Sequence, residues 1–383
     1  MRRLWSLPLL AAALVALSFD ATPVEAQAAK PTEEAFTTAD GVRLKGLFHK
    51  SPNGPKQGNA VVMLLYPPGA ERTMLKGDWD GLVDALNTEG FHVFRFDWRG
   101  HGGSTDIVDP VGDNMPIGGV LYNGFFSNGI TGGWNVRYVK GGALAKKPNE
   151  LRVKGGITLP AYLPVFVNDL AAARLHLDQK NDNGEVNTSS LYIVGAGETA
   201  SLGMMWLASE WQRPGVAPLL GGGLQYKATP TPGIVVDPPA GADIAGAVWL
   251  SGSRPPVFPQ TTVQWWAKSS VKLRDNNKML FLYGGTDAAA KKDADFFFDQ
   301  VLVADGRKGA AGVAAVEQTF KADLGKTNLN GVALLGKDKD LKTETKILEY
   351  LKARQKDRVD MIRKSRNYVT PYYVNVNHYL SPR

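Results

Sequence analysis

Strand-like and helix-like patterns of apolar residues alternate along this chain. Residues 60–66 and 91–96 form short, nearly continuous apolar runs, which are typical of strands covered on both faces of a sheet. Between them, residues 79–86 carry apolar side chains at the three- and four-residue spacing of a helix, and Gly90 ends that pattern. This part of the chain is therefore predicted to form a strand, a helix and a second strand.

The same alternation continues through the rest of the chain. Alternating residues at 36–47, around Asp40-Gly41, predict a β-hairpin before the first buried strand. Further along, the patterns predict helices at 169–178 and 200–211 and strands at 191–194, 245–250 and 278–283. Strands that alternate with helices at this spacing predict an α/β fold with a mostly parallel central sheet and helices on both faces.

Two stretches interrupt this rhythm. Residues 108–157 are rich in Gly, Asn and aromatic residues, and residues 213–241 are rich in Pro and Gly. Neither stretch repeats itself internally, so we interpret both as insertions or loops, the first of them cap-like and placed after the early strands. Residues 27–383 are accordingly expected to form a single domain, which ends in a basic helix and tail at 337–383.

The first residues have the pattern of a secretory signal peptide. Arg2 and Arg3 precede a mainly apolar segment at 4–19, and small residues near Ala26 offer a cleavage site. The alternative is a membrane anchor, but the segment contains Pro8 and is shorter than the roughly 20 residues that span a bilayer. We therefore expect residues 1–26 to be removed and the protein to be secreted or periplasmic.

Composition excludes several kinds of chemistry. The chain has no cysteine, which excludes disulfides, a thiol nucleophile, thiolate metal sites and a lipid-modified N-terminal cysteine. No His/Asp/Glu cluster has the spacing of metal ligands, so the sequence predicts neither a metal nor a cofactor.

The formal net charge of +7 is concentrated near the C-terminus, where residues 337–366 contain eleven Lys/Arg and six Asp/Glu. Apolar residues from Leu341 to Ile362 recur at a helical spacing, which predicts a solvated amphipathic helix. The alternative is a weak contact with an anionic surface. The interleaved acidic residues argue against nucleic-acid binding.

Residues 191–201 form a strand, a tight turn of small residues and the start of a helix. The arrangement is that of a nucleophile elbow, Gly-x-Ser-x-Gly, in which a strained turn lifts a serine hydroxyl above the sheet. Gly195 matches the first glycine, but Gly197 stands at the position of the serine. Since glycine has no side chain, the elbow is predicted to lack its nucleophile.

Three landmarks in this order resemble the α/β-hydrolase superfamily. The buried strand at 60–66 ends in Tyr66-Pro67-Pro68-Gly69, at the position of the family's oxyanion loop. The next strand is followed by Asp97-Trp-Arg-Gly-His-Gly-Gly-Ser104, which is similar to the family's Asp-x-Arg-Gly-His-Gly-x-Ser turn. The elbow is the third landmark. The resemblance covers most of the mature chain and implies the α/β-hydrolase fold.

The resemblance also implies where catalytic residues would lie, and the chain departs from it there. The family order is Ser, then an acid after a late strand, then His before the last helix. Asp287 matches the acid position, but residues 326–336 contain no histidine. The chain has five histidines, namely His49, His92, His101, His176 and His378. Because the serine and the histidine work as a unit, the loss of both predicts a degenerate member.

Several residues offer alternatives to the missing groups. Glu198 is a candidate carboxylate nucleophile in a shifted register, although a negative charge also suits the first turn of a helix. Thr199 and Ser201 lie past the apex of the turn, where helix polarity explains them. Ser253 follows a predicted strand at the same edge, and His378 would have to fold back from the tail to act as a base. The Asn187-Thr-Ser sequon is expected in an exposed turn.

These observations favour binding over catalysis. In this fold a crevice forms at the carboxyl ends of the strands, where Pro67, Pro68, Gly69, Gly197 and Asp287 are expected to converge. The backbone N–H groups after Gly197 are expected to hold a carboxylate or carbonyl of a small-molecule or peptide ligand. The alternative is an active exported esterase or peptidase with a non-standard nucleophile and base.

Overall fold

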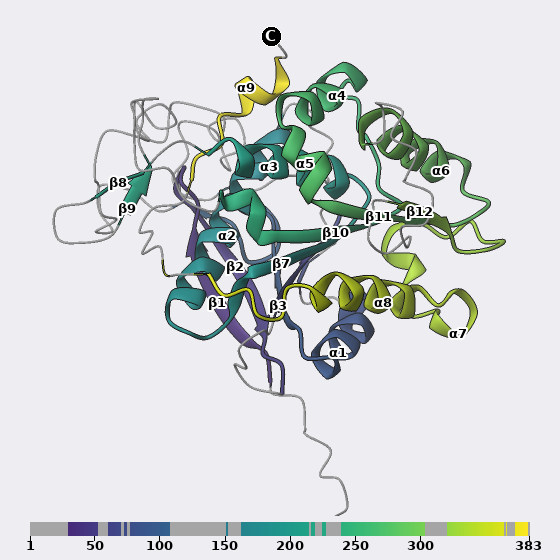
Figure 1. Ribbon diagram of the computed structural model, residues 1–383, viewed down its shortest axis with the longest axis horizontal. Coiled ribbons are helices and arrows are strands. Elements are labelled where there is room, and N and C mark those ends of the chain that lie inside the picture. Colours follow the sequence, from purple (N-terminus) through teal and green to yellow (C-terminus); the bar gives the residue numbers. More distant parts are fainter. Residues whose placement is uncertain are drawn as a thin grey trace, which may run out of the picture.

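Within the described residues, a nine-stranded mixed sheet forms the centre of the molecule (Figure 1). This computed structural model describes residues 30–52, 60–69, 73–74, 77–107, 151, 162–213, 216–218, 224–226, 239–302, 320–363, 365 and 372–381. In spatial order the strands are β1 (Thr32–Thr37), β2 (Val42–His49), β4 (His92–Phe96), β3 (Ala60–Leu65), β7 (Asn187–Ala196), β10 (Ile244–Leu250), β11 (Lys278–Tyr283) and β12 (Phe320–Asp323). The short β5 (Asp106–Ile107) pairs with β2.

The sheet changes from antiparallel to parallel along its width. β2 is antiparallel to both β1 and β4, whereas every pairing from β4 through β3, β7, β10 and β11 to β12 is parallel. The hairpin register sets Phe36 opposite Leu44, and Gly41 in its turn has a φ of 84°, which glycine adopts without strain. The predicted hairpin is therefore confirmed.

Helices cover both faces of the sheet (Figure 1). On one face lie α1 (Asp80–Thr88) and α8 (Thr343–Lys356), the latter preceded by the short α7 (Asp338–Leu341). On the other face lie α2 (Val167–Asp182), α3 (Thr199–Trp211), α4 (Gln260–Ser269), α5 (Val271–Asn276), α6 (Ala288–Asp295) and α9 (Val376–Leu380). A π-helical segment, Phe296–Leu302, follows α6, and a separate small hairpin contains β8 (Val216–Pro218) and β9 (Leu224–Tyr226).

The strand β3 illustrates how the sequence builds two cores. All six of its residues are buried. Val61, Met63 and Leu65 belong to the core beneath α2 to α6, whereas Val62 and Leu64 belong to the core beneath α1 and α8. Successive side chains of a strand point to opposite faces, so a continuous apolar run satisfies both layers.

The strand order and the helix layers confirm the predicted α/β-hydrolase fold. The N-terminal segment 1–26 lies outside the described residues, as does nearly all of the predicted insertion at 108–157. The single-domain organisation and the cap-like character of that insertion stay predictions. Among the described helices, none is long and apolar enough to cross a membrane.

Two predictions about surface segments are wrong. The C-terminal helix does not continue to Ile362, because α8 ends at Lys356 and a turn and irregular chain follow. The sequon does not lie in an exposed turn either. Asn187 begins β7, is 6% exposed, and its side-chain amide donates to the carbonyl oxygen of Met361 at 2.8 Å.

Candidate functional site

The elbow has the predicted strand–turn–helix geometry. β7 ends at Ala196, Gly197 turns the chain with a φ of 60°, and α3 begins at Thr199. The N–H of Gly197 donates to the carbonyl oxygen of Leu250 at 3.1 Å, and its own carbonyl oxygen accepts from the N–H of Ser253 at 2.9 Å. The turn is therefore fixed to the end of the neighbouring strand β10.

The two glycines of the elbow have different reasons to be glycine. A Cβ atom at Gly195 would lie 2.4 Å from Oγ1 of Thr199 and 2.9 Å from the ring of Trp249, so no side chain fits there. At Gly197 the nearest atoms would be Cβ of Pro67 at 3.4 Å and Oγ of Ser253 at 4.0 Å. Packing leaves room for a side chain at the apex, and the chain places none there.

The predicted oxyanion loop reaches the apex through Pro67. The indole Nε1 of Trp98 donates to the carbonyl oxygen of Tyr66 at 2.7 Å, which holds the end of β3 in place. Pro67, Pro68 and Gly69 are all half-buried, and the space around the position of a Cβ at Gly69 is open for 4 Å. Of these three residues, Pro67 is the one placed against Gly197.

The polar residues after the apex differ in how far their groups are engaged. The hydroxyl of Thr199 donates to the carbonyl oxygen of Ala196 at 2.8 Å, and that of Ser201 donates to the carbonyl oxygen of Ser253 at 2.9 Å. Glu198 is half-buried at the N-cap of α3, and its side chain does not cap the helix. Within the described part of the chain, neither the N–H nor the carboxylate of Glu198 has a hydrogen-bond partner.

Asp287 serves as a helix cap. Its carboxylate accepts from the N–H of Ala290 at 3.0 Å at the start of α6, and its own N–H donates to the carbonyl oxygen of Gly284 at 2.9 Å. This is the ordinary use of an aspartate at a helix N-terminus. Among the described residues, no hydrogen bond or ion pair joins Asp287 to the elbow.

The loop that would carry the catalytic histidine reaches the elbow without one. The loop after β12 is joined to the acid loop by bonds from Gly285 to Gly325 at 2.9 Å and from Thr286 to Thr327 at 3.0 Å. A Cβ at Gly331 would lie 3.8 Å from Cβ of Ala196, the last residue of β7. The loop in which the resemblance implies a histidine therefore lies next to the elbow, but residues 326–336 contain no histidine.

His101, His176 and His378 all have other contacts. His101 is 3% exposed, and its Nδ1 lies 2.9 Å from the carbonyl oxygen of Arg99 in the turn after β4. Burial lowers the pKa of His101 despite that contact. His176 pairs with Glu34 at 2.5 Å, and His378 packs on the ring of Trp265 with 5.4 Å between centroids.

His49 and His92 are buried between the early strands. Nε2 of His49 accepts from Nε of Arg95 at 3.1 Å, and Nδ1 of His92 accepts from the N–H of Ser51 at 3.0 Å. Burial lowers the pKa of each to about 4, and the cation of Arg95 adds to this at His49. Within the described residues, none of the five histidines contacts the elbow.

The turn after β4 holds the sheet together. Asp97 accepts from the N–H of Met74 at 2.6 Å and of Gly103 at 2.9 Å, and burial raises the pKa of this carboxyl group. The fully buried Arg99 pairs with Asp40 at 2.5 Å and with Asp169 at 2.7 Å. These contacts join the hairpin, the turn and α2, so the second landmark is a structural element.

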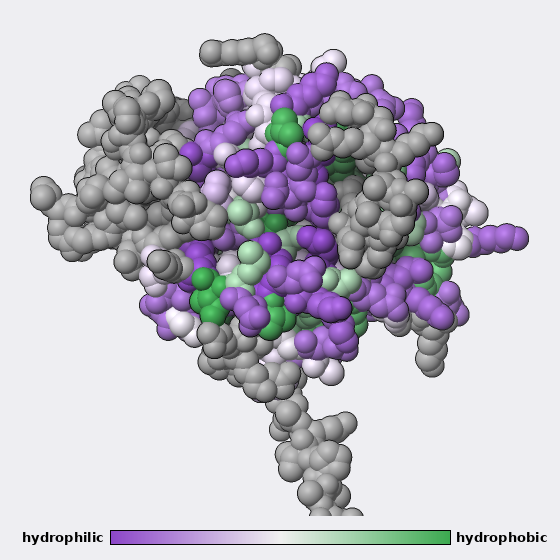
Figure 2. All heavy atoms as spheres, viewed as in Figure 1, coloured by the Kyte–Doolittle hydropathy of each residue, from purple (hydrophilic) through white to green (hydrophobic). Residues whose placement is uncertain are grey.

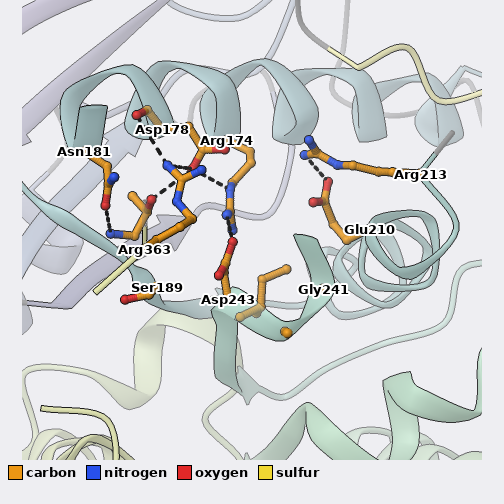
Figure 3. Close-up of polar contacts among 12 residues, drawn as sticks. Arg174, Asp178, Asn181, Ser189, Glu210, Arg213, Gly241, Asp243 and Arg363 are labelled. Atoms are coloured by element: carbon orange, nitrogen blue, oxygen red, sulfur yellow. Dashed lines mark hydrogen bonds and ion pairs between the residues drawn. The ribbon is translucent and has the colours of Figure 1, made fainter. Parts of the chain in front are cut away.

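A second set of buried charges lies between α2, α3 and the C-terminal segment (Figure 3). Arg174 pairs with Asp178 at 2.8 Å and with Asp243 at 2.6 Å, and Arg363 pairs with Asp178 at 3.1 Å. Sequence reasoning missed this network. Its members lie in segments far apart in the sequence, and the i,i+4 pair on α2 is its one local signal.

No described group of three or more His, Asp or Glu residues is arranged to hold a metal ion. The polar groups that surround the apex are thus the hydroxyl of Ser253 and the N–H and carboxylate of Glu198. The hydroxyl of Ser253 and the N–H of Glu198 can donate hydrogen bonds to an oxygen atom of a ligand, whereas the carboxylate of Glu198 can only accept them. Among the described residues, no imidazole accompanies these groups.

Comparisons with known proteins give likenesses of fold. No family model matches the sequence, and no curated protein matches it. An esterase from Pyrococcus furiosus is 14% identical, with 86% of this chain and 92% of that chain covered at a TM-score of 0.44. A dipeptidyl peptidase 4 from Porphyromonas gingivalis is 13% identical, with 85% of this chain and 35% of that chain covered at a TM-score of 0.45.

A dienelactone hydrolase from Anabaena variabilis is 10% identical, with 85% of this chain and 98% of that chain covered at a TM-score of 0.42. At these identities and scores, the likeness to the three solved structures carries no argument about activity.

Proposed function

We propose that this protein of the α/β-hydrolase fold binds a ligand at the carboxyl edge of its sheet, around Gly197, and does not hydrolyse it. The observation that carries the proposal is the apex of the elbow. Gly197 keeps the turn, with a φ of 60° and room for a side chain, but supplies no nucleophile. The ligand is a small molecule or peptide that presents a carbonyl or carboxylate oxygen.

Two donors near the apex suit such an oxygen. The N–H of Glu198 has no acceptor within the described residues and stands at the positive end of α3. The hydroxyl of Ser253 lies 4.0 Å from the position of the absent Cβ. Ser253 is held there by its own N–H, which donates to Gly197, and by the hydroxyl of Ser201, which donates to its carbonyl oxygen.

Hydrolysis would need a base that the described residues do not place at the elbow. A serine hydroxyl becomes a nucleophile when an adjacent imidazole takes its proton. His49, His92 and His101 are engaged elsewhere, and Asp287 caps a helix. An ester formed on the carboxylate of Glu198 would lack the same base for its hydrolysis.

A fluorophosphonate probe and a panel of short-chain esters test the absence of catalysis. We expect neither labelling nor turnover from the parent protein or from Gly197→Ser, with Gly69→Ser as a matched control in open space. Ester turnover created by Gly197→Ser alone would mean that a base reaches the apex, and the proposal would be wrong.

Binding is tested by calorimetry with short-chain carboxylic acids and their amides. We expect Ser253→Ala to weaken binding of the best ligand about five- to twentyfold, since one hydrogen bond to a carboxylate is lost. Thr262→Ala, which removes a buried hydroxyl on α4, is the control and should leave the affinity unchanged. Equal affinity of the parent and Ser253→Ala would remove Ser253 from the site.

An active hydrolase with a non-standard constellation is the alternative, and the place of Ser253 beside the vacant apex favours it. In that case the probe would label the parent protein, and the label would disappear in Ser253→Ala. Such a result would replace the binding proposal.

Export is the second part of the proposal. Arg2, Arg3 and the apolar segment at 4–19 support a signal peptide, which would place the protein in the periplasm or outside the cell. Mass spectrometry of the protein from the periplasm or culture medium of its host should give a chain that begins near residue 27. Recovery of the whole chain from the cytoplasm would contradict export.

A further inference from the structure

We infer that the loop after α8 is a membrane-contact surface for anionic lipid bilayers, formed by the side chains of Val359, Met361 and Ile362. These three residues are 47%, 47% and 51% exposed. Among the described large hydrophobic residues that are exposed, the one other member is Val271 on α5. The exposed apolar side chains of the described chain are thus concentrated within four consecutive residues.

The backbone of this loop is firmly held although its side chains are exposed. The guanidinium of Arg358 donates to the carbonyl oxygen of Ser189 and, at 2.9 Å, to that of Ala242. The carbonyl oxygen of Met361 accepts from the side chains of Asn187, at 2.8 Å, and of Ser189. The loop is therefore attached on both sides of Val359 to the start of β7.

Arg363 ends the loop inside the protein (Figure 3). Its guanidinium is 2% exposed and lies 3.1 Å from Asp178 and 3.5 Å from Asp182 on α2. The backbone of the loop is thus fixed by Arg358, by Arg363 and by the carbonyl oxygen of Met361, which accepts two hydrogen bonds. The apolar side chains between the two arginines remain exposed. Three exposed apolar groups in a fixed loop form a small apolar patch, and such a patch can enter the interface of a bilayer.

Charge favours an anionic bilayer over a neutral one. Residues 352–366 contain seven Lys/Arg and two Asp/Glu. Without the anchored Arg358 and Arg363, five cations remain beside the two acidic residues, Asp357 and Asp360, which are exposed. Each cation near an anionic surface contributes attraction in addition to the apolar contact. In Figure 2, apolar side chains interrupt a mainly polar face along the path that the segment after α8 follows in Figure 1.

The start of the described chain lies at the same end of the molecule. Glu34 on β1 contacts His176 at 2.5 Å and Lys180 at 2.6 Å, on the same part of α2 that binds Arg363. The first strand and the loop after α8 therefore contact the same part of α2. Membrane contact is thus moved from the basic face of α8, where the sequence suggested it, to the loop that follows.

The absence of cysteine allows a direct test on the protein as its host produces it. Met361→Cys and Val271→Cys are each labelled with an environment-sensitive fluorophore and mixed with vesicles of phosphatidylcholine and phosphatidylglycerol. The two positions are 47% and 46% exposed, so they are matched before binding. We expect a blue shift, and quenching by lipids with nitroxides on their acyl chains, at position 361 and not at 271.

A second variant tests the contribution to affinity. Val359→Ser/Met361→Ser/Ile362→Ser should partition onto these vesicles at least about tenfold more weakly than the parent, because three half-exposed apolar groups no longer enter the interface. An unchanged spectrum at position 361, an equal shift at both positions, or equal binding to pure phosphatidylcholine would each overturn the inference. A shift at 361 that depends on protein concentration without vesicles would indicate a second copy of the chain as the partner, and would overturn it as well.

Discussion

Two buried histidines should make this protein sensitive to mild acid. His49 and His92 both accept a hydrogen bond through a ring nitrogen, from Arg95 and from the N–H of Ser51 respectively. Protonation would remove the acceptor in each case and would set a cation beside Arg95 at His49. Burial lowers the pKa of each histidine to about 4 in the folded protein, from the ordinary value of 6.5.

The sign of the effect follows from where the protons bind. Between pH 6.5 and pH 4 the unfolded chain takes up protons at these histidines and the folded protein does not, so stability falls as the pH is lowered through this window. Between pH 8 and pH 5 each histidine should lower the free energy of unfolding by about 2 kcal/mol, and the two together by about 4 kcal/mol.

Urea denaturation at pH 8 and pH 5 measures this loss, and a double variant isolates it. His49→Gln/His92→Asn places a non-titrating oxygen near each accepting nitrogen, so about 4 kcal/mol of the pH-dependent loss should disappear. His378→Gln, at an exposed position, is the control, and its free energy of unfolding should fall between pH 8 and pH 5 by as much as that of the parent. If the double variant lost as much between the two pH values as the parent, the assignment of neutral buried histidines would be wrong.

Three further predictions concern the elbow and the buried charges. Gly197→Ser should fold with a loss of about 1–2 kcal/mol, from the positive φ rather than from packing, by urea denaturation. Asp287→Ala should lower the free energy of unfolding by about 1 kcal/mol through the lost cap of α6, and Asp287→Ser should recover most of this loss. A larger effect of Asp287→Ala on ligand affinity than on stability would mean that Asp287 belongs to the ligand site. Arg174→Met should lower the free energy of unfolding by about 3–5 kcal/mol because two carboxylates lose their buried partner. The exposed pair of Lys291 is the control for this change, and Lys291→Met should cost less than about 1 kcal/mol.

The elements that the sequence predicted well are those with strong local patterns. The run at 60–66 and the turn at Asp40-Gly41 gave a buried strand and a hairpin, because periodicity and turn chemistry act over a few residues. The elbow at Gly197 was found in the same way. Its φ of 60° is a property of a tight turn that a glycine signals directly.

What the sequence did not predict depends on distant partners. The helical spacing at the C-terminus continues to Ile362, but α8 ends at Lys356 because the next residues are bonded to the start of β7. The strand β12 and the short helix α9 were also missed. The exposed-turn interpretation of Asn187 failed for the same reason, since its partner, Met361, lies 174 positions away in the chain.

The burial of Asn187 has a practical consequence for producing this protein. Oligosaccharyl transfer acts on the side-chain amide of an Asn-x-Ser/Thr sequon while the chain is still unfolded, and here that amide must later bond to Met361. In a eukaryotic secretory host, a glycan on Asn187 would occupy the place where the C-terminal segment docks, so folding and modification would compete for one nitrogen atom. A bacterial host avoids this competition. In a host that glycosylates, a substitution of Ser189 would remove the sequon but also one of the bonds to that carbonyl, so the choice of expression system is set by the fold itself.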